Sequence, residues 1–121
     1  MLLGIKRIYD KPEITDGKRI LIDRLWPRGV KKGTANIDLW MKDVAPSNEL
    51  RKWFSHDPSK WEQFKAKYRK ELEGNKAFGD LLLMVKSTDV TLIYAARDTD
   101  HNDALVLKEL IEEKLKAAGQ A

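Results

Sequence analysis

The sequence predicts an α/β domain, with a Rossmann-like sheet of about three to four mostly parallel strands flanked by helices, rather than a true dinucleotide-binding fold. Residues 90–96 are apolar and β-branched, and a polar loop and an amphipathic segment at 103–118 follow them. Strand, polar loop and amphipathic helix make half of a βαβ unit. Residues 20–25 are a second apolar segment, and they continue into a basic loop punctuated by glycines.

Length and composition indicate one soluble domain. The chain has 121 residues, of which 42% are hydrophobic and 35% charged, so we expect a single domain over residues 1–118 and a frayed tail at 119–121. The absence of cysteine excludes thiol nucleophiles and disulfides and suits a reducing compartment. No apolar stretch approaches the roughly 20 residues that span a bilayer, and the first residues do not resemble a secretory leader. We therefore expect a cytoplasmic protein without a membrane partner.

The first half of the chain predicts two strands and a short helix. Residues 3–9 and 20–25 have the β-favouring, apolar character of strands, and the second is expected to be buried on both faces. The connector at 10–17 is short for a crossover helix, so the relative direction of the two strands stays open. Thr34 or Asn36 can cap a short helix around residues 37–41.

The second half predicts four helices and one strand. Helices are expected at 48–54, 58–73, 76–86 and 103–118, with the strand 90–96 before the last one. Ser47 and Asp57 are the expected caps of the first two helices, and Asp98 or Asp100 that of the last. Asp100 and Asp103 resemble a capping box. Three of the four tryptophans fit apolar helix faces and are assigned to the core, namely Trp40, Trp53 and Trp61.

Charged side chains follow two of the predicted strands. In open α/β sheets ligands bind beyond the carboxyl ends of the strands. If strands 20–25 and 90–96 are parallel neighbours, one cleft collects the residues Asp23, Arg24, Arg28, Arg97, Asp98 and His101. The sequence therefore predicts a ligand site at this edge.

The predicted site combines fixed positive charge with acid–base groups. Arginine forks suit phosphate or carboxylate, whereas an acid and a neutral imidazole suit proton transfer. Asp23 and His101 are the candidate catalytic residues, and the candidate substrate-binding residues are Arg24, Trp26, Arg28, His56, Arg97 and Asn102. Asp23 lies in an apolar segment and needs a partner, for which Arg24, Arg97 and backbone amides are the candidates.

Each assignment has a structural alternative. Asp23 and its arginine can form an ion pair that only stabilises the fold. Trp26 can line a ligand pocket or close the end of the strand, and His56 can be a turn residue. No histidine spacing typical of a metal site and no phosphate-loop signature occurs, so we predict no metal and no cofactor.

Net charge and site together favour a small anionic ligand. The net charge of +4 and the pI near 9.3 mildly favour anionic partners, although they also serve solubility. Our leading hypothesis is a domain that binds a phosphorylated or nucleotide-like anion, and the sequence does not decide whether it also catalyses a reaction. A nucleic-acid-binding module, with Lys31, Lys32 and the helix at 60–70 as a phosphate track, is one alternative. A structural or partner-binding domain is another. The oligomeric state is left open.

The chain also resembles a known family, the YeaO-like group of the domain-of-unknown-function family numbered 488. The resemblance covers nearly the whole chain, and it is most specific at the string from Asp23 to Gly29. It implies a small α/β cytoplasmic domain and, by itself, no activity. The wider family favours cysteine or glutamate where this chain has Ala95, Ala96 and Asp100, while His101 is kept. A thiol-based mechanism therefore does not carry over.

Overall fold

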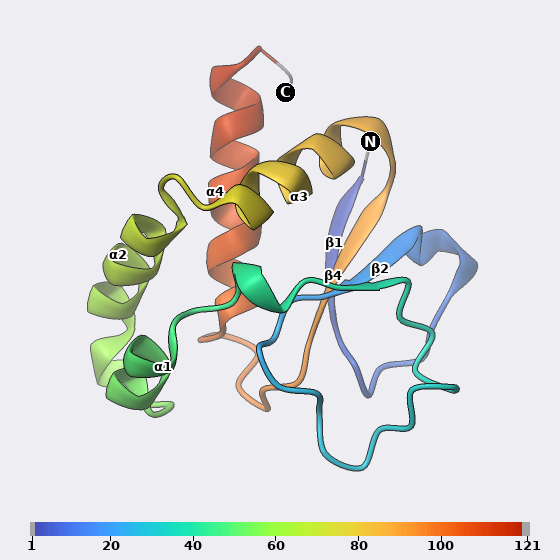
Figure 1. Cartoon of the computed structure of the whole chain (residues 1–121), viewed down its shortest axis with the longest axis horizontal. Helices are drawn as coiled ribbons and strands as arrows, with labels where there is room; N and C mark the ends of the chain where they lie inside the picture. Colours follow the sequence, from blue (N-terminus) through green and yellow to red (C-terminus); the bar gives the residue numbers. More distant parts are fainter. Residues whose placement is uncertain (1, 120–121) are drawn as a thin grey trace.

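The structure is a computed structural model that describes residues 2–119. It contains one sheet of four parallel strands in the order β1-β4-β2-β3 (Figure 1). The strands are β1 (Leu3–Arg7), β2 (Lys18–Leu21), β3 (Leu39–Trp40) and β4 (Val90–Tyr94). The α/β fold class is confirmed. The direction of the first strand, which the sequence left open, is parallel to β4.

The strands at the centre of the sheet are shorter than predicted. The prediction extended β2 to residue 25 and β4 to residue 96, but they end at Leu21 and Tyr94. The last rung joins the amide of Ile22 to the carbonyl of Ile93 at 3.0 Å. At the next position the amide of Ala95 donates to the side chain of Asp23, at 2.9 Å, instead of to a backbone carbonyl. The carboxylate of Asp23 thus takes the place of the next backbone acceptor, and the pairing of β2 with β4 ends here.

The short helix predicted at 37–41 is wrong. This segment contains β3 instead, whose Leu39 and Trp40 pair with Ile20 and Leu21 of β2. Asn36, an expected cap, has a left-handed backbone with φ of 54°. A segment of five residues is too short to be a stable helix by itself, so pairing with the edge of β2 decides its conformation.

Four α-helices follow the predicted boundaries closely. They are α1 (Asn48–Phe54), α2 (Trp61–Leu72), α3 (Lys76–Ser87) and α4 (Asp103–Ala117). Ser47 caps α1 as expected, and Asp57 caps the short 3₁₀ turn Pro58–Lys60 that precedes α2. The predicted cap of α4, Asp98 or Asp100, is wrong, because Asn102 is the cap and accepts a hydrogen bond from the Leu105 amide at 3.0 Å. The expected capping box between Asp100 and Asp103 does not form.

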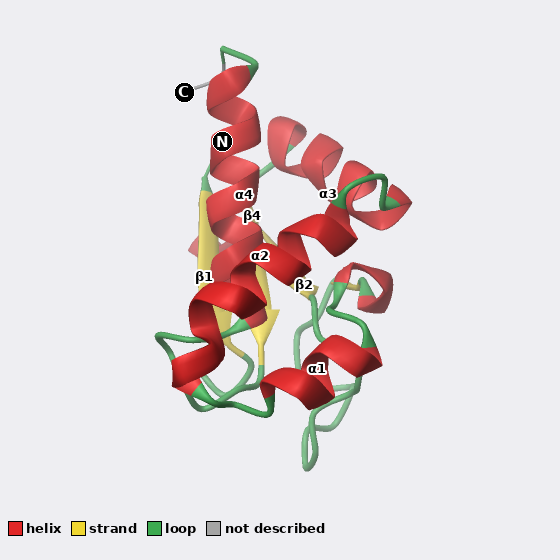
Figure 2. Ribbon diagram, turned by 90° about the vertical axis from the view of Figure 1, so that its left-hand side faces the viewer, coloured by secondary structure: helices red, strands yellow, loops and turns green. Residues whose placement is uncertain are grey.

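The helices pack on one face of the sheet. Buried side chains from all four helices form one cluster with Ile20, Val90 and Leu92, and α4 packs directly on β1 and β4 (Figure 2). The opposite face is covered by the loop after β2, where Leu21 and Ile93 contact apolar side chains of residues 26–37. This alternation follows from the period of two along a strand. The carboxyl ends of β2 and β4 therefore lie between the helical layer and the loop after β2.

The tryptophans divide between these two layers. Trp53 and Trp61 pack against the main core from α1 and α2, as predicted. Trp40 also packs against apolar side chains, but it lies in β3 rather than in a helix and belongs to the second cluster. It meets the ring of Trp26 edge-on, with the ring centroids 5.5 Å apart.

The start of β2 is held by a buried charge network. Asp16 pairs with Lys6 and Arg19, each at 2.7 Å, and Arg19 also donates to the carbonyl of Asn36 at 2.9 Å. Gly17, between Asp16 and Arg19 in the chain, has φ of 64°. A Cβ atom at this position would lie 2.5 Å from the carbonyl oxygen of Asp89. Only glycine therefore fits this turn. The connection between β1 and β2 contains a short 3₁₀ turn, Ile14–Asp16, in place of a crossover helix.

We expect Asp16→Asn to lower the free energy of unfolding at pH 7 by about 3 kcal/mol, because the buried guanidinium of Arg19 loses its counter-ion. Burial acts to raise the pKa of Asp16, but hydrogen bonds from Lys6, the Glu13 amide and Arg19 lower it from 3.8 to about 2. The contribution of this carboxylate to stability is therefore complete above about pH 4 and is lost as the pH falls through about 2.

Urea denaturation at a series of pH values measures both effects. Asp43→Asn, in an exposed turn, is the matched control and should change neither stability nor its pH dependence. If Asp16→Asn and the wild type lost the same stability between pH 4 and pH 2, the assigned role of Asp16 would be wrong.

The domain boundaries remain a prediction. Residues 120 and 121 of the expected tail lie outside the described residues, as does residue 1. Gly119 is described, and its amide donates to the carbonyl of Lys116 at 3.0 Å.

Candidate ligand site at the strand ends

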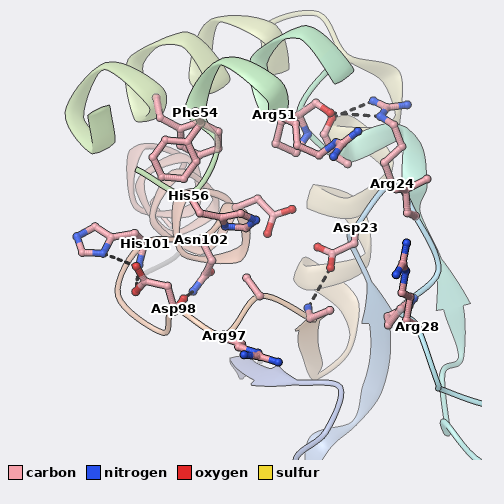
Figure 3. Close-up of a pocket in the computed structure, with 18 of the residues that line it drawn as sticks. Asp23, Arg24, Arg28, Arg51, Phe54, His56, Arg97, Asp98, His101 and Asn102 are labelled. Atoms are coloured by element: carbon pink, nitrogen blue, oxygen red, sulfur yellow. Dashed lines mark hydrogen bonds and ion pairs between the residues drawn. The ribbon is translucent and has the colours of Figure 1, made fainter. Parts of the chain in front are cut away.

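A cavity of about 710 Å³ opens at the carboxyl ends of β2 and β4 (Figure 3). Its lining comes from the loops after these strands, from α1 and α2, and from the start of α4. The residues are Asp23, Arg24, Leu25, Trp26, Pro27, Arg28, Ala45, Pro46, Arg51, Phe54, His56, Phe64, Ala95, Ala96, Arg97, Asp98, His101, Asn102 and Asp103. All eight site residues predicted from the sequence are among them. The convergence arises because β2 and β4 are adjacent and parallel.

Asp23 is held inside the cavity by two hydrogen bonds. The Ala95 amide donates to its Oδ2 at 2.9 Å, and its other partner is the side chain of Asp103. Of the three partners that the sequence left open, a backbone amide is therefore the one used. Burial raises the pKa of Asp23 above its ordinary value, although both hydrogen bonds act in the opposite direction.

Asp103 forms the second half of this acid pair. It is the first residue of α4, and its Oδ1 accepts a hydrogen bond from the Ala104 amide at 3.0 Å. Burial and the neighbouring Asp23 carboxylate raise the pKa of Asp103 well above its ordinary value. The hydrogen bond between the two side chains raises the pKa of Asp103 and lowers that of Asp23. Asp103 is therefore the member of the pair that more strongly favours its protonated form.

Arginines from three different segments surround the cavity. Arg28 follows β2, Arg51 lies on α1, and Arg97 follows β4; all three side chains are exposed. None forms an ion pair with any residue in the range 2–119. Arg24 differs, because its guanidinium donates to the carbonyls of Ala45 and Pro46, each at 3.2 Å. Arg24 therefore anchors the wall of the cavity.

The two histidines have different surroundings. Nδ1 of His101 lies 2.9 Å from Oδ2 of Asp98, and its ring meets Trp61 edge-on at 5.3 Å. Figure 3 shows this pair at one edge of the cavity, with Asp23 at the other. Hydrogen bonds from the Asp100 amide and from His101 lower the pKa of Asp98. His101 and Asp23 thus have no direct contact.

His56 is presented by an unusual turn after α1. Ser55 and His56 have consecutive positive φ angles of 46° and 56°. Such backbone is uncommon outside glycine, although histidine adopts it more readily than most residues. It reverses the chain, and in Figure 3 the imidazole of His56 projects towards the middle of the cavity.

The side chains of Trp26 and Asn102 form hydrogen bonds within the protein. The indole N–H of Trp26 donates to the carbonyl of Val30 at 2.7 Å, so this side chain both lines the cavity and closes its loop. The buried amide of Asn102 caps α4 and donates to the carbonyl of Asp98 at 3.0 Å. Both residues shape the site by positioning its loops.

Sequence reasoning missed four important lining residues, namely Arg51, Phe54, Phe64 and Asp103. Arg51 and the two phenylalanines lie on helices that were predicted correctly, but the sequence does not show which helix ends beside the strand ends. Asp103 was assigned to a capping box. Asp103 directly follows Asn102 at the start of the last helix, and this position could have indicated a second acidic residue in the cavity.

No cluster of three or more potential metal ligands occurs within residues 2–119. In the same part of the chain, none of the helices has the length and apolar character needed to cross a membrane.

Comparison with known proteins shows the family. A family model described as "DUF488-N3i: Inactive DUF488-N3 subclade" matches residues 2–121. The chain belongs to this family. The resemblance noted from the string Asp23 to Gly29 is thereby confirmed.

Two relatives with similar sequences are described as uncharacterized proteins. The uncharacterized protein YeaO of Escherichia coli strain K12 is 43% identical over 110 residues, which cover 90% of this chain and 96% of the relative. An uncharacterized protein of Mycobacterium tuberculosis strain H37Rv is 36% identical over 107 residues, covering 88% of this chain and 91% of the relative. No solved structure matches the chain.

We expect Asp103→Asn to stabilise the protein at alkaline pH and to leave it nearly unchanged at acid pH. Because folding raises the pKa of Asp103, its contribution to stability is complete at low pH and is lost as the pH rises through the folded pKa. Asparagine can still donate to Asp23 and accept from the Ala104 amide, but it does not ionise.

Thermal unfolding midpoints between pH 4 and pH 9 test this prediction. Asp100→Asn, an exposed residue three positions earlier, serves as the control. A lower midpoint for Asp103→Asn throughout the pH range would contradict the raised pKa of Asp103.

Proposed function

We propose that this chain binds a small phosphorylated or nucleotide-like anion in the cavity at the strand ends. One observation carries the proposal: the exposed guanidinium groups of Arg28, Arg51 and Arg97 surround one cavity and have no ion-pair partner in residues 2–119. Where an arginine only stabilises the fold it has an internal partner, as Arg24 and Arg19 do here.

The chemistry of the lining supports this ligand class. Guanidinium groups bind phosphate and carboxylate through parallel N–H donors. Their arrangement around one opening concentrates positive potential there, which attracts anions. The lining also contains Leu25, which is exposed, and Trp26, which is half-buried, and these side chains offer apolar surface to a ring or sugar. A cavity of this kind, mostly apolar with a few converging polar groups, is typical of small-molecule sites.

Binding without chemistry has more support than catalysis. The acid–base role predicted for Asp23 and His101 needs both groups at the reacting atoms. In the structure His101 is hydrogen-bonded to Asp98, away from Asp23, and Asp23 accepts a hydrogen bond from the Ala95 amide. The matched family model is described as an inactive subclade. These observations favour a binding protein in which Asp23 is a recognition residue.

The two alternatives have weaker support. The predicted lysine track on α2 is interrupted where Lys65 pairs with Glu62, and Lys60 and Lys67 lie against the ring of Trp53. A purely structural cluster accounts for Asp23 and Arg24, whose partners are internal. It does not account for the exposed arginines. The cytoplasmic location expected from the sequence remains a prediction.

We expect Arg97→Gln and Arg28→Gln each to weaken phosphate-dependent ligand binding about tenfold or more, because a hydrogen bond to a charged group contributes about 1.5–3 kcal/mol. Both side chains are exposed, so the free energy of unfolding should change by less than about 1 kcal/mol. Thermal shift and calorimetric titration with nucleotides, sugar phosphates and inorganic phosphate measure the effect.

Lys86→Gln is the matched control, because it removes one exposed positive charge from α3, which precedes the amino end of β4. It should leave binding unchanged. A complete panel of these compounds without a thermal shift in the wild type would remove the basis of the proposed function.

A further inference from the structure

The cavity contains two kinds of polar group. Arg28, Arg51 and Arg97 are exposed at its opening, whereas Asp23 and Asp103 are less exposed and lie within it. A purely anionic ligand would make no favourable contact with two carboxyl groups, whose oxygens are hydrogen-bond acceptors. The pair therefore calls for a different part of the same ligand, namely one that offers hydrogen-bond donors.

The hydrogen-bond capacity of the pair defines this part. Each carboxyl accepts one backbone amide, from Ala95 at 2.9 Å and from Ala104 at 3.0 Å. The lone pairs that remain are acceptors only. No lysine or arginine within residues 2–119 forms an ion pair with either acid. Adjacent N–H donors of a ligand can fill these positions.

A planar ring lies in the same cavity. The imidazole of His56 is exposed and projects towards the middle of the cavity, whereas the rings of Phe54 and Phe64 are buried and stack on each other, with centroids 4.4 Å apart. An exposed aromatic face supports a planar heterocycle by stacking. Donors on one edge, a planar ring and an anionic group are thus three requirements on one molecule.

We propose, building on the anion-binding function above, that the ligand is a guanine nucleotide. The N1–H and the 2-amino group of guanine are neighbouring donors on one edge, and they donate to the carboxyl oxygens of Asp23 and Asp103. The phosphate lies against the arginines of the opening. Adenine does not fit, because its N1 lone pair would face the lone pairs of the acids. Hypoxanthine keeps N1–H but lacks the amino donor.

Calorimetric titration of the wild-type protein with GMP, IMP and AMP tests this proposal. We expect GMP to bind about tenfold or more tightly than IMP, because a lost hydrogen bond to a charged acceptor has about that effect. AMP should bind more weakly than IMP. Binding of IMP or AMP as tight as that of GMP would overturn the proposal while leaving the anion-binding function intact. Failure of all three, and of the phosphate panel, would overturn both.

Two variants separate the contributions of the acids and the arginines. Asp23→Asn combined with Asp103→Asn should abolish the preference for GMP over IMP, and Arg97→Gln should weaken both ligands by the same factor. Preserved preference in the double variant would contradict the proposal. Circular dichroism verifies its fold, and the wild-type series decides the question if that variant does not fold.

One further titration distinguishes binding of a free nucleotide from binding of a nucleic-acid strand. The trinucleotide UpGpU presents the same guanine within a nucleic acid, whereas GMP presents it alone. The size of the cavity, about 710 Å³, fits a single nucleotide, so we expect GMP to bind more tightly. Tighter binding of the trinucleotide would assign the guanine contact to a nucleic-acid strand and overturn the free nucleotide as the ligand.

Discussion

The parallel pairing of β4 with β2 is the constraint on which the rest of this structure depends. β4 is buried along its whole length and pairs with β1 on one side and with β2 on the other. Because β2 and β4 run in the same direction, their carboxyl ends meet at one edge of the sheet. The loops that follow them are separated by some seventy residues in the chain, yet Asp23 and Ala95 are hydrogen-bonded to each other.

That hydrogen bond also explains the local structure around it. A carboxylate in an apolar segment is costly unless it is bonded, and Asp23 meets this need by taking the amide that would have continued the ladder. Both strands consequently end there, and the loops diverge. The opening that results is walled by Arg24, which holds the carbonyls of Ala45 and Pro46. The same residues therefore end the sheet and form the cavity.

The distribution of charge separates structural from available groups. Arg19 is buried and paired with Asp16, so it serves the fold. Arg28 and Arg97 are exposed beside a cavity and unpaired within the described part of the chain, so their charge is available to a ligand. This contrast supports the proposed recognition site, and it is compatible with a family model that is described as inactive.

Much of the fold was determined by the sequence alone. The period of apolar residues in α1 to α4, together with the caps Ser47 and Asp57, predicted the helices closely, because capping and amphipathic packing are local. The gathering of the predicted site residues around one cavity followed from the rule for strand ends. Only the tertiary structure decided that residues 39–40 form a strand, that Asn102 caps α4 and that Asp103 faces Asp23. These features depend on which segments become neighbours, and contacts across the sheet leave no period in the sequence.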